Sequence, residues 1–218
     1  MASPENLAAI SSEGQRLLAY AKAAPELNVP QYPTWTLRDL AVHTASMHAR
    51  TARICEALPR ERIAAPELPD GRDALEWCQQ TLAAMVEALH AADPEAEVWT
   101  TIPDGRLRAW ERRMVIETGL HRWDAQQAIE DPAPLLPLVA SHGLDEFADM
   151  WLPRLGDVAT IEVSATDLGR SWRFGGGEPS TVVAATASDL FLGLMARPGE
   201  QLPADWERAV HRLATPAD

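Results

Sequence analysis

Apolar residues recur at three- and four-residue spacing through most of the first 155 positions of this 218-residue chain. This spacing places them on one face of an α-helix. The first such segment begins at Ser3-Pro4, where serine can cap the first turn and proline fits the first helical position. The predicted helices are residues 4–24, 36–58, 73–92, 107–129 and 138–155. Four long helices joined by loops predict an up-and-down bundle.

Two of the connecting segments are rich in proline. Residues 28–35 contain too much proline to be helical, and residues 58–72 are expected to form a loop that crosses the bundle. The helix that follows the first of these segments has Thr36 as its expected cap, with Asp39 three residues later in the position of a capping box.

The pattern changes after Gly156. Residues 159–165 alternate between apolar and polar positions as a strand does, and residues 171–174 and 180–186 predict two further strands. Helical spacing returns at residues 188–197 and 204–214. This tail of about 60 residues is too small to hold a core alone, so we expect it to dock on the bundle.

The sequence therefore predicts a mainly α protein with two domains. The first, residues 1–155, is a helical bundle, and the second, residues 156–218, is a small α/β (α+β) C-terminal domain docked on that bundle.

Charge narrows the range of partners. The formal net charge is -13, and Lys22 is the one lysine among 19 basic residues. Such an acidic chain argues against nucleic acid and anionic membrane surfaces as partners.

The preference for arginine, with abundant alanine, is typical of a GC-rich genome such as that of an actinobacterium. Neither a secretory signal nor an apolar run of about 18–20 residues is present, which predicts a cytoplasmic protein. The two cysteines, Cys55 and Cys78, lack motif spacing and are expected to be reduced and without chemistry.

The best chemical signal lies in the segment RRMVIETGLHRWDA. Glu117 and His121 are four residues apart, so their side chains share one face of a helix and can bind one divalent metal ion. An exposed Glu–His pair without a metal is the ordinary alternative. Asp124 is a candidate hydrogen-bond partner for His121. Arg113 either meets a substrate carboxylate or pairs with Glu117 or Asp39.

A third candidate ligand, His43, lies on another predicted helix, on or beside its apolar face. Facing helices of a bundle are common positions for metal sites, and three protein ligands with an open fourth position are typical of catalytic zinc. The order of these residues is not the HExxH of zinc proteases. His48 is expected at the surface or on the flank of the same helix. The eight tryptophans are expected to fill the core, and none is predicted to bind a ligand.

The segments PTWTLRDLAVH, WERRMVIETGLHRWDAQQAI and ASHGLDEF resemble the mycothiol-dependent maleylpyruvate isomerase family, within the DinB-like four-helix-bundle metalloenzymes. The tail segments IEVSATDLGRSWRF and VVAATASDLFLGLMARPG resemble the C-terminal domain of that family. The resemblance implies that His43, Glu117 and His121 hold a divalent metal, usually zinc. It also implies that an arginine from the C-terminal domain, here Arg197, reaches the site as a catalytic residue. The family usually has Trp-Gly before this arginine, and this chain has Met195-Ala196.

The resemblance implies an enzyme that uses Zn²⁺ and mycothiol as a thiol cosubstrate. The metal-activated thiolate would attack a small electrophile such as maleylpyruvate, in an isomerase or an S-transferase reaction. Two alternatives remain at this point. One is a metal-dependent hydrolase in which water replaces the thiol, and the other is a non-catalytic metal-binding or stress-response protein of the same fold. The chain is expected to be a monomer or a homodimer.

Overall fold

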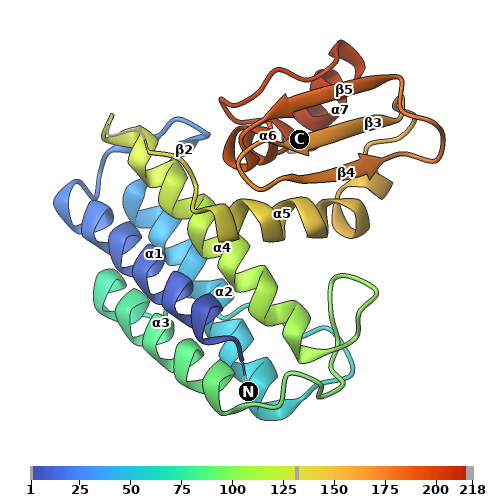
Figure 1. Cartoon of the computed structure of the whole chain (residues 1–218). Helices are drawn as coiled ribbons and strands as arrows, with labels where there is room; N and C mark the ends of the chain where they lie inside the picture. Colours follow the sequence, from blue (N-terminus) through green and yellow to red (C-terminus); the bar gives the residue numbers. More distant parts are fainter. Residues whose placement is uncertain (1, 131–132, 215–218) are drawn as a thin grey trace. The chain divides into compact units, whose positions relative to one another are not determined.

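The computed structural model describes residues 2–130 and 133–214, which form two compact units that divide between Ala133 and Pro134. The first unit is a four-helix bundle of α1 (Pro4–Ala23), α2 (Leu37–Ala57), α3 (Ala74–Ala91) and α4 (Leu107–Ala128) (Figure 1). In the described part of the chain, no helix is both long and apolar enough to cross a membrane.

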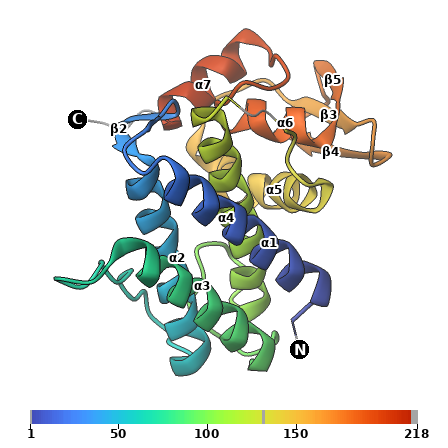
Figure 2. The same ribbon diagram turned by 90° about the vertical axis from the view of Figure 1, so that its left-hand side faces the viewer.

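Helices α1 and α2 each pack against both α3 and α4 (Figure 2). Contacts along the helices give their directions. The N-terminal turn of α1 lies near Glu111 and its middle lies near Arg122, so α1 and α4 run the same way. His43 lies near His121, and Arg50 lies near Trp110, so α2 runs opposite to α4.

Helix α3 is parallel to α2. In the groove between them, the middle of α2 lies beside the first half of α3, and the end of α2 lies beside the second half of α3. The bundle is therefore ordered up, down, down, up. Residues 58–73 carry the chain back along the length of the bundle between α2 and α3. The mainly helical bundle is confirmed, but a strictly alternating up-and-down order is not, because the crossover of residues 58–73 makes its second and third helices parallel.

Side-chain caps set the starts of three bundle helices, and those at Ser3 and Thr36 are the caps that the sequence predicts. Ser3 accepts a hydrogen bond from the backbone of Asn6, and Asp73 caps α3 in the same manner. Thr36 and Asp39 form a reciprocal capping box at the start of α2. Such caps satisfy backbone N–H groups that have no partner within the helix.

The proline-rich segment before α2 is a small β-hairpin. Strands β1 (Asn28–Val29) and β2 (Tyr32–Thr36) pair antiparallel across a tight turn at Pro30 and Gln31. Val29 is fully buried in the bundle core, and the backbone N–H of Leu37 donates to the carbonyl of Leu27 at 2.9 Å. The hairpin is thus anchored to the bundle at both of its ends.

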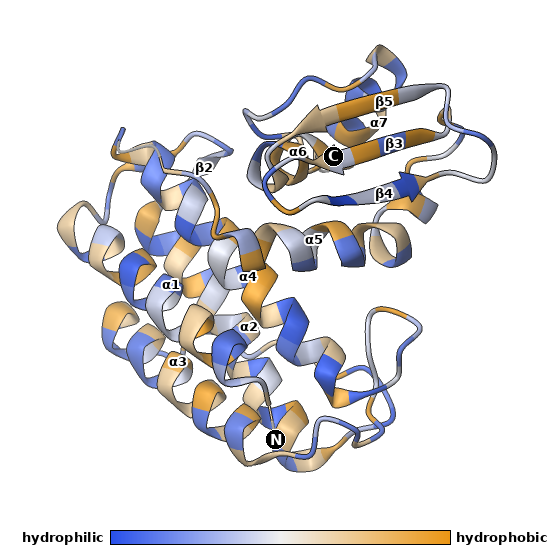
Figure 3. Cartoon of the chain, viewed as in Figure 1, coloured by the Kyte–Doolittle hydropathy of each residue, from blue (hydrophilic) through white to orange (hydrophobic). Residues whose placement is uncertain are grey.

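The second unit contains a three-stranded sheet with helices beside it. Its strands β3 (Ile161–Ala165), β4 (Arg170–Phe174) and β5 (Thr181–Ala185) lie in the order β4-β3-β5, with β3 antiparallel to β4 and parallel to β5. β4 is the most hydrophilic of the three strands (Figure 3). The helices are α5 (Pro137–Met150), the 3₁₀ turn η1 (Leu152–Arg154), α6 (Ala187–Leu194) and α7 (Ala204–Ala214).

Helix α5 belongs to the second unit, whereas the predicted boundary at residue 155 places it with the bundle. It packs against α6 so closely that a Cβ atom on Gly143 would lie 2.4 Å from the ring of Phe191. Phe147 of α5 also joins a cluster with Phe174 and Trp206. An apolar helical face predicts burial without naming the partner, so the sequence pattern alone does not place α5.

A buried ion pair joins α1 to α4. Arg122 Nε donates to Glu13 Oε2 at 2.6 Å, and the two side chains are 0% and 2% exposed. Arg16 also contacts Glu13, but its side chain is 43% exposed. Removing one partner of a buried ion pair leaves the other charge uncompensated, whereas an exposed pair contributes little.

We therefore expect Arg122→Met to lower the free energy of unfolding by about 3–5 kcal/mol, measured by urea denaturation. The matched control Arg16→Ala should cost less than about 1 kcal/mol. The double variant Glu13→Leu/Arg122→Met should recover most of the loss, because it removes both buried charges. Equal losses for Arg16→Ala and Arg122→Met would show that the buried pair has no special weight.

Candidate metal centre

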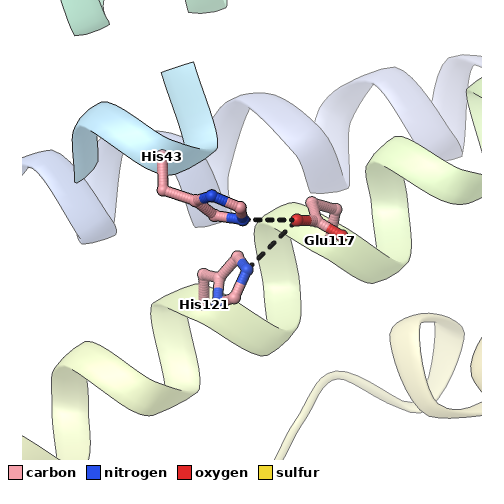
Figure 4. A group of neighbouring side chains, drawn as sticks. All are labelled: His43, Glu117 and His121. Carbon is pink, nitrogen blue, oxygen red and sulfur yellow. Dashed lines mark hydrogen bonds and ion pairs between the residues drawn. The ribbon is translucent and has the colours of Figure 1, made fainter. Parts of the chain in front are cut away.

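Three predicted ligands, His43, Glu117 and His121, lie together in the first unit (Figure 4). Glu117 Oε1 is 3.1 Å from Nε2 of His121 and 3.3 Å from Nε2 of His43. One potential ligand atom from each of the three residues lies within 4.8 Å of the other two. The side chains thus converge on one point with two imidazole nitrogens and a carboxylate oxygen.

Local geometry explains why these residues meet. Glu117 and His121 are one helical turn apart on α4, which stacks their side chains. His43 lies in the second turn of α2, which runs opposite to α4 at this level of the bundle. Helices α2 and α4 are in contact, so a residue on each can reach the space between them.

Two further charged residues contact the two triad residues of α4. Arg113 Nη2 donates to Glu117 Oε2 at 2.6 Å, so one carboxylate oxygen faces the arginine and the other faces the imidazoles. Nδ1 of His121 lies 3.0 Å from Oδ2 of Asp124, whose side chain is fully buried. Of the carboxylates expected as partners of Arg113, the one it contacts in the structure is that of Glu117. A carboxylate on the far nitrogen of a histidine is the usual support for a metal ligand.

The charges of the triad stabilise one another. Burial alone would raise the pKa of Glu117, but Arg113 and His121 hold it well below its ordinary value. Burial alone would lower the pKa of His121, but the carboxylates of Glu117 and Asp124 raise it to about 9. Without an ion, the site therefore favours a carboxylate at Glu117 and a protonated imidazole at His121.

The triad is accessible from the side of His43. The His43 side chain is 39% exposed, whereas those of Glu117 and His121 are 8% and 6% exposed. A site with two buried donors and one at the surface can admit a ligand from solvent while the protein fixes its inner half.

His48 is buried, so its expected position at the surface or on the flank of α2 is wrong. Its Nε2 lies 2.9 Å from the hydroxyl of Thr118, and only 3% of the residue is exposed. Burial lowers the pKa of His48 to about 4, which keeps the ring neutral. The buried face of α2 includes Leu40, Thr44 and His48, at four-residue spacing, and His43 lies beside that stripe. The four-residue interval from Thr44 is the signal that could have placed His48 in the core.

Two aromatic residues beside the triad were not predicted to have a role there. The rings of Tyr32 and Trp35 stack with centroids 4.8 Å apart. The centroid of Trp35 lies 5.0 Å from that of His43, and the centroid of Tyr32 lies 6.0 Å from that of His121. Both rings come from the β1–β2 hairpin, so periodicity within the helices could not reveal their position.

Arg197 lies in the second unit, just after α6. It is buried, its backbone N–H donates to the carbonyl of Leu192, and its Nη1 donates to the carbonyl of Met195 at 3.0 Å. The expected helix of residues 188–197 is shorter, ends at Leu194 and is capped by Thr186 rather than Ser188. Arg197 thus belongs to the turn that closes α6, and its catalytic role stays a prediction.

Comparison with known proteins gives consistent matches. The family model of the mycothiol maleylpyruvate isomerase N-terminal domain matches residues 7–126. No curated protein matches the chain. One similar solved structure is the crystal structure of the mycothiol-dependent maleylpyruvate isomerase, at 12% identity and a TM-score of 0.65. A histidine-to-alanine mutant of that enzyme gives 12% identity and a TM-score of 0.67. Each alignment covers 91% of this chain and 94% of the other, which shows a common fold.

The buried His48 gives an acid-sensitive stability. The unfolded chain binds a proton at this residue near pH 6.5, and the folded chain binds it only near pH 4. Stability is therefore unaffected by this residue above pH 6.5 and falls as the pH drops from 6.5 to 4, by about 3 kcal/mol in total. The raised pKa of His121 has the opposite sign, and its contribution is lost as the pH rises from 6.5 to about 9.

We expect His48→Gln, which can still meet Thr118, to reduce the loss of stability between pH 6.5 and 4. Urea denaturation of the metal-free protein and variant across this range measures it, and carboxylates that titrate in both proteins cancel in the difference. Identical pH dependence in the two proteins would contradict the expectation.

Proposed function

The chain belongs to the mycothiol maleylpyruvate isomerase family, and on that premise we propose a divalent-metal-dependent enzyme that uses mycothiol as its thiol cosubstrate. The observation that carries the proposal is the convergence of His43, Glu117 and His121 on one point. The reaction is an isomerisation or an S-transfer on a small electrophile. A thiol cosubstrate of this kind places the enzyme in the reducing cytoplasm.

The donor set suits a divalent ion such as Zn²⁺. Two imidazole nitrogens and one carboxylate oxygen are ordinary zinc ligands, and three protein ligands leave a further position for a small molecule. His43 and His121 would bind through Nε2, and Glu117 would bind through Oε1 because Arg113 occupies its other oxygen. Asp124 would accept the Nδ1–H of His121 and so fix the tautomer that binds a metal.

A bound divalent ion would lower the pKa of a thiol at its open position, which supplies a thiolate at neutral pH. The chain's own residues then have distinct tasks. Arg113 holds the charge and orientation of Glu117, Asp124 orients His121, and the half-exposed His43 borders the side from which the thiol enters.

The sulfur would add to the double bond of a cis-enone diacid such as maleylpyruvate. Rotation about the resulting single bond, followed by loss of the same thiol, gives the trans isomer and regenerates the cosubstrate. An electrophile that cannot expel the sulfur keeps it and becomes an S-conjugate. Arg197 is proposed to bind a carboxylate of the substrate, because a chain of net charge -13 needs a local cation to hold an anion.

The metal content of the purified protein tests the centre. We expect about one divalent ion per chain, since the three ligands define one site. Glu117→Gln and His121→Ala should weaken binding by more than about 100-fold, beyond the effect of residues that only support ligands. The control His90→Ala changes an exposed histidine at the end of α3 and should retain the ion.

Elemental analysis and calorimetric titration measure this. Wild-type protein that binds no divalent ion would overturn the proposed function. An ion without any thiol-dependent turnover would favour the binding protein or, where water suffices for turnover, the hydrolase.

Arg197 is tested by the charge of the substrate. Arg197→Lys keeps the positive charge but loses the planar fork that grips a carboxylate. We expect turnover of maleylpyruvate with mycothiol to fall about tenfold or more, as for the loss of a hydrogen bond to a charged group. Conjugation of an uncharged electrophile such as N-ethylmaleimide should change little. Equal losses for both substrates, or a melting temperature that falls with activity, would assign Arg197 to the turn after α6 alone.

A further inference from the structure

Four rings at the candidate metal centre each contact two of the others. Trp35 stacks on Tyr32, Trp35 packs against His43, His43 meets His121 edge-on at 5.2 Å, and Tyr32 lies beside His121. Glu117 connects the two imidazoles by hydrogen bonds. Each histidine of the triad is therefore in contact with one aromatic ring of the hairpin.

The two histidines are held in place by different means. Nδ1 of His121 faces the carboxylate of Asp124, which fixes the orientation of the ring. In the residues that the structure describes, the polar contact of His43 is the one through Nε2 to Glu117. A metal-binding histidine usually has its second nitrogen held by a hydrogen-bond partner. The ring of His43 instead packs against Trp35, with an angle of 46° between the two planes.

The hairpin is a firm support for this contact. Trp35 directly precedes Thr36, whose capping box with Asp39 sets the start of α2. On the other strand, the side-chain amide of Asn28 donates to the carbonyl of Pro33 at 2.9 Å, and Val29 is anchored in the core. Trp35 itself is half-buried against that core. A flat ring on such a base restricts the rotamers open to a side chain that is 39% exposed.

We propose that Trp35, backed by Tyr32, is a positioning residue that holds the imidazole of His43 with its Nε2 toward Oε1 of Glu117. Trp35 thus orients the ring of His43, as Asp124 orients the ring of His121. This inference rests on the proposed function, because it gives the triad its role as a metal centre. Removing the ring frees His43 to turn toward solvent, so the metal must order the ligand as it binds.

Metal binding by variants of Trp35 tests the inference. We expect Trp35→Leu, which keeps apolar bulk on the hairpin, to weaken Zn²⁺ binding about 10–100-fold, the effect of losing a supporting residue. Trp35→Phe keeps a flat ring and should restore affinity to within a few-fold of wild type. The matched control Trp99→Ala removes another half-buried tryptophan of the same unit, one that packs on Trp110 away from the triad, and should leave affinity unchanged.

Two readouts separate positioning from simple packing. The melting temperature of each metal-free variant reports the structural cost, and the absorption spectrum of the Co²⁺-loaded protein reports ligand geometry. We expect Trp35→Leu to change the Co²⁺ spectrum and Trp35→Phe to preserve it. Wild-type affinity and spectrum in Trp35→Leu would overturn the inference while leaving the metal centre intact. A loss of affinity that Trp35→Phe does not restore would also overturn it, and wild-type protein without metal binding would overturn the proposed function itself.

Discussion

The buried carboxylate of Glu117 is the constraint on which the arrangement of this site depends. A carboxylate withdrawn from water is strongly destabilising unless charged or hydrogen-bonding groups surround it. Here one oxygen meets the guanidinium of Arg113 and the other meets the Nε2 atoms of both histidines. Residues from α2 and α4 are thereby fixed relative to each other, and the mutual geometry of the candidate ligands follows from the need to compensate one charge.

Buried polar and charged residues that need partners occur along much of the length of helix α4. Besides the triad residues, Glu111, Arg122 and Gln126 are buried on it, and each has a polar partner. Glu111 accepts hydrogen bonds from Ser3 and Asn6 at the start of α1, and Arg122 meets Glu13, about two turns after Asn6 along α1. The polar groups of α4 thus select the register between α1 and α4, since a shift of one turn would leave several buried charges without partners. The same register sets the height of Glu117 and His121 in the bundle.

Local chemistry made much of this predictable from the sequence. Helical periodicity and the caps at Ser3 and Thr36 mark the starts of helices, and four-residue spacing joins Glu117 to His121. The alternation of residues 159–165 likewise identifies β3. Interactions within one element or one turn depend on residues that are close together in the sequence, so the spacing of residue types predicts them.

Contacts between distant segments are less visible. The parallel course of α2 and α3 follows from the crossover of residues 58–73, and the polar partner of His48 is Thr118 of another helix. The choice of α6 as the partner of α5 depends on the fit of Phe191 over Gly143. Each of these is a choice among partners of similar polarity or size, which periodicity does not distinguish.

The charged groups of the triad compensate one another, and this bears on how an ion would bind. A protonated His121 between Glu117 and Asp124 stabilises the folded chain without any ion. An incoming metal must therefore displace that proton, and part of its binding free energy is spent in doing so. In return, the ligands need little rearrangement, because Glu117 holds both Nε2 atoms near one oxygen. In a bundle whose core is formed by apolar side chains and the Glu13–Arg122 pair, folding and metal binding can then be separate events. That separation distinguishes such a centre from small domains that fold only around their ion.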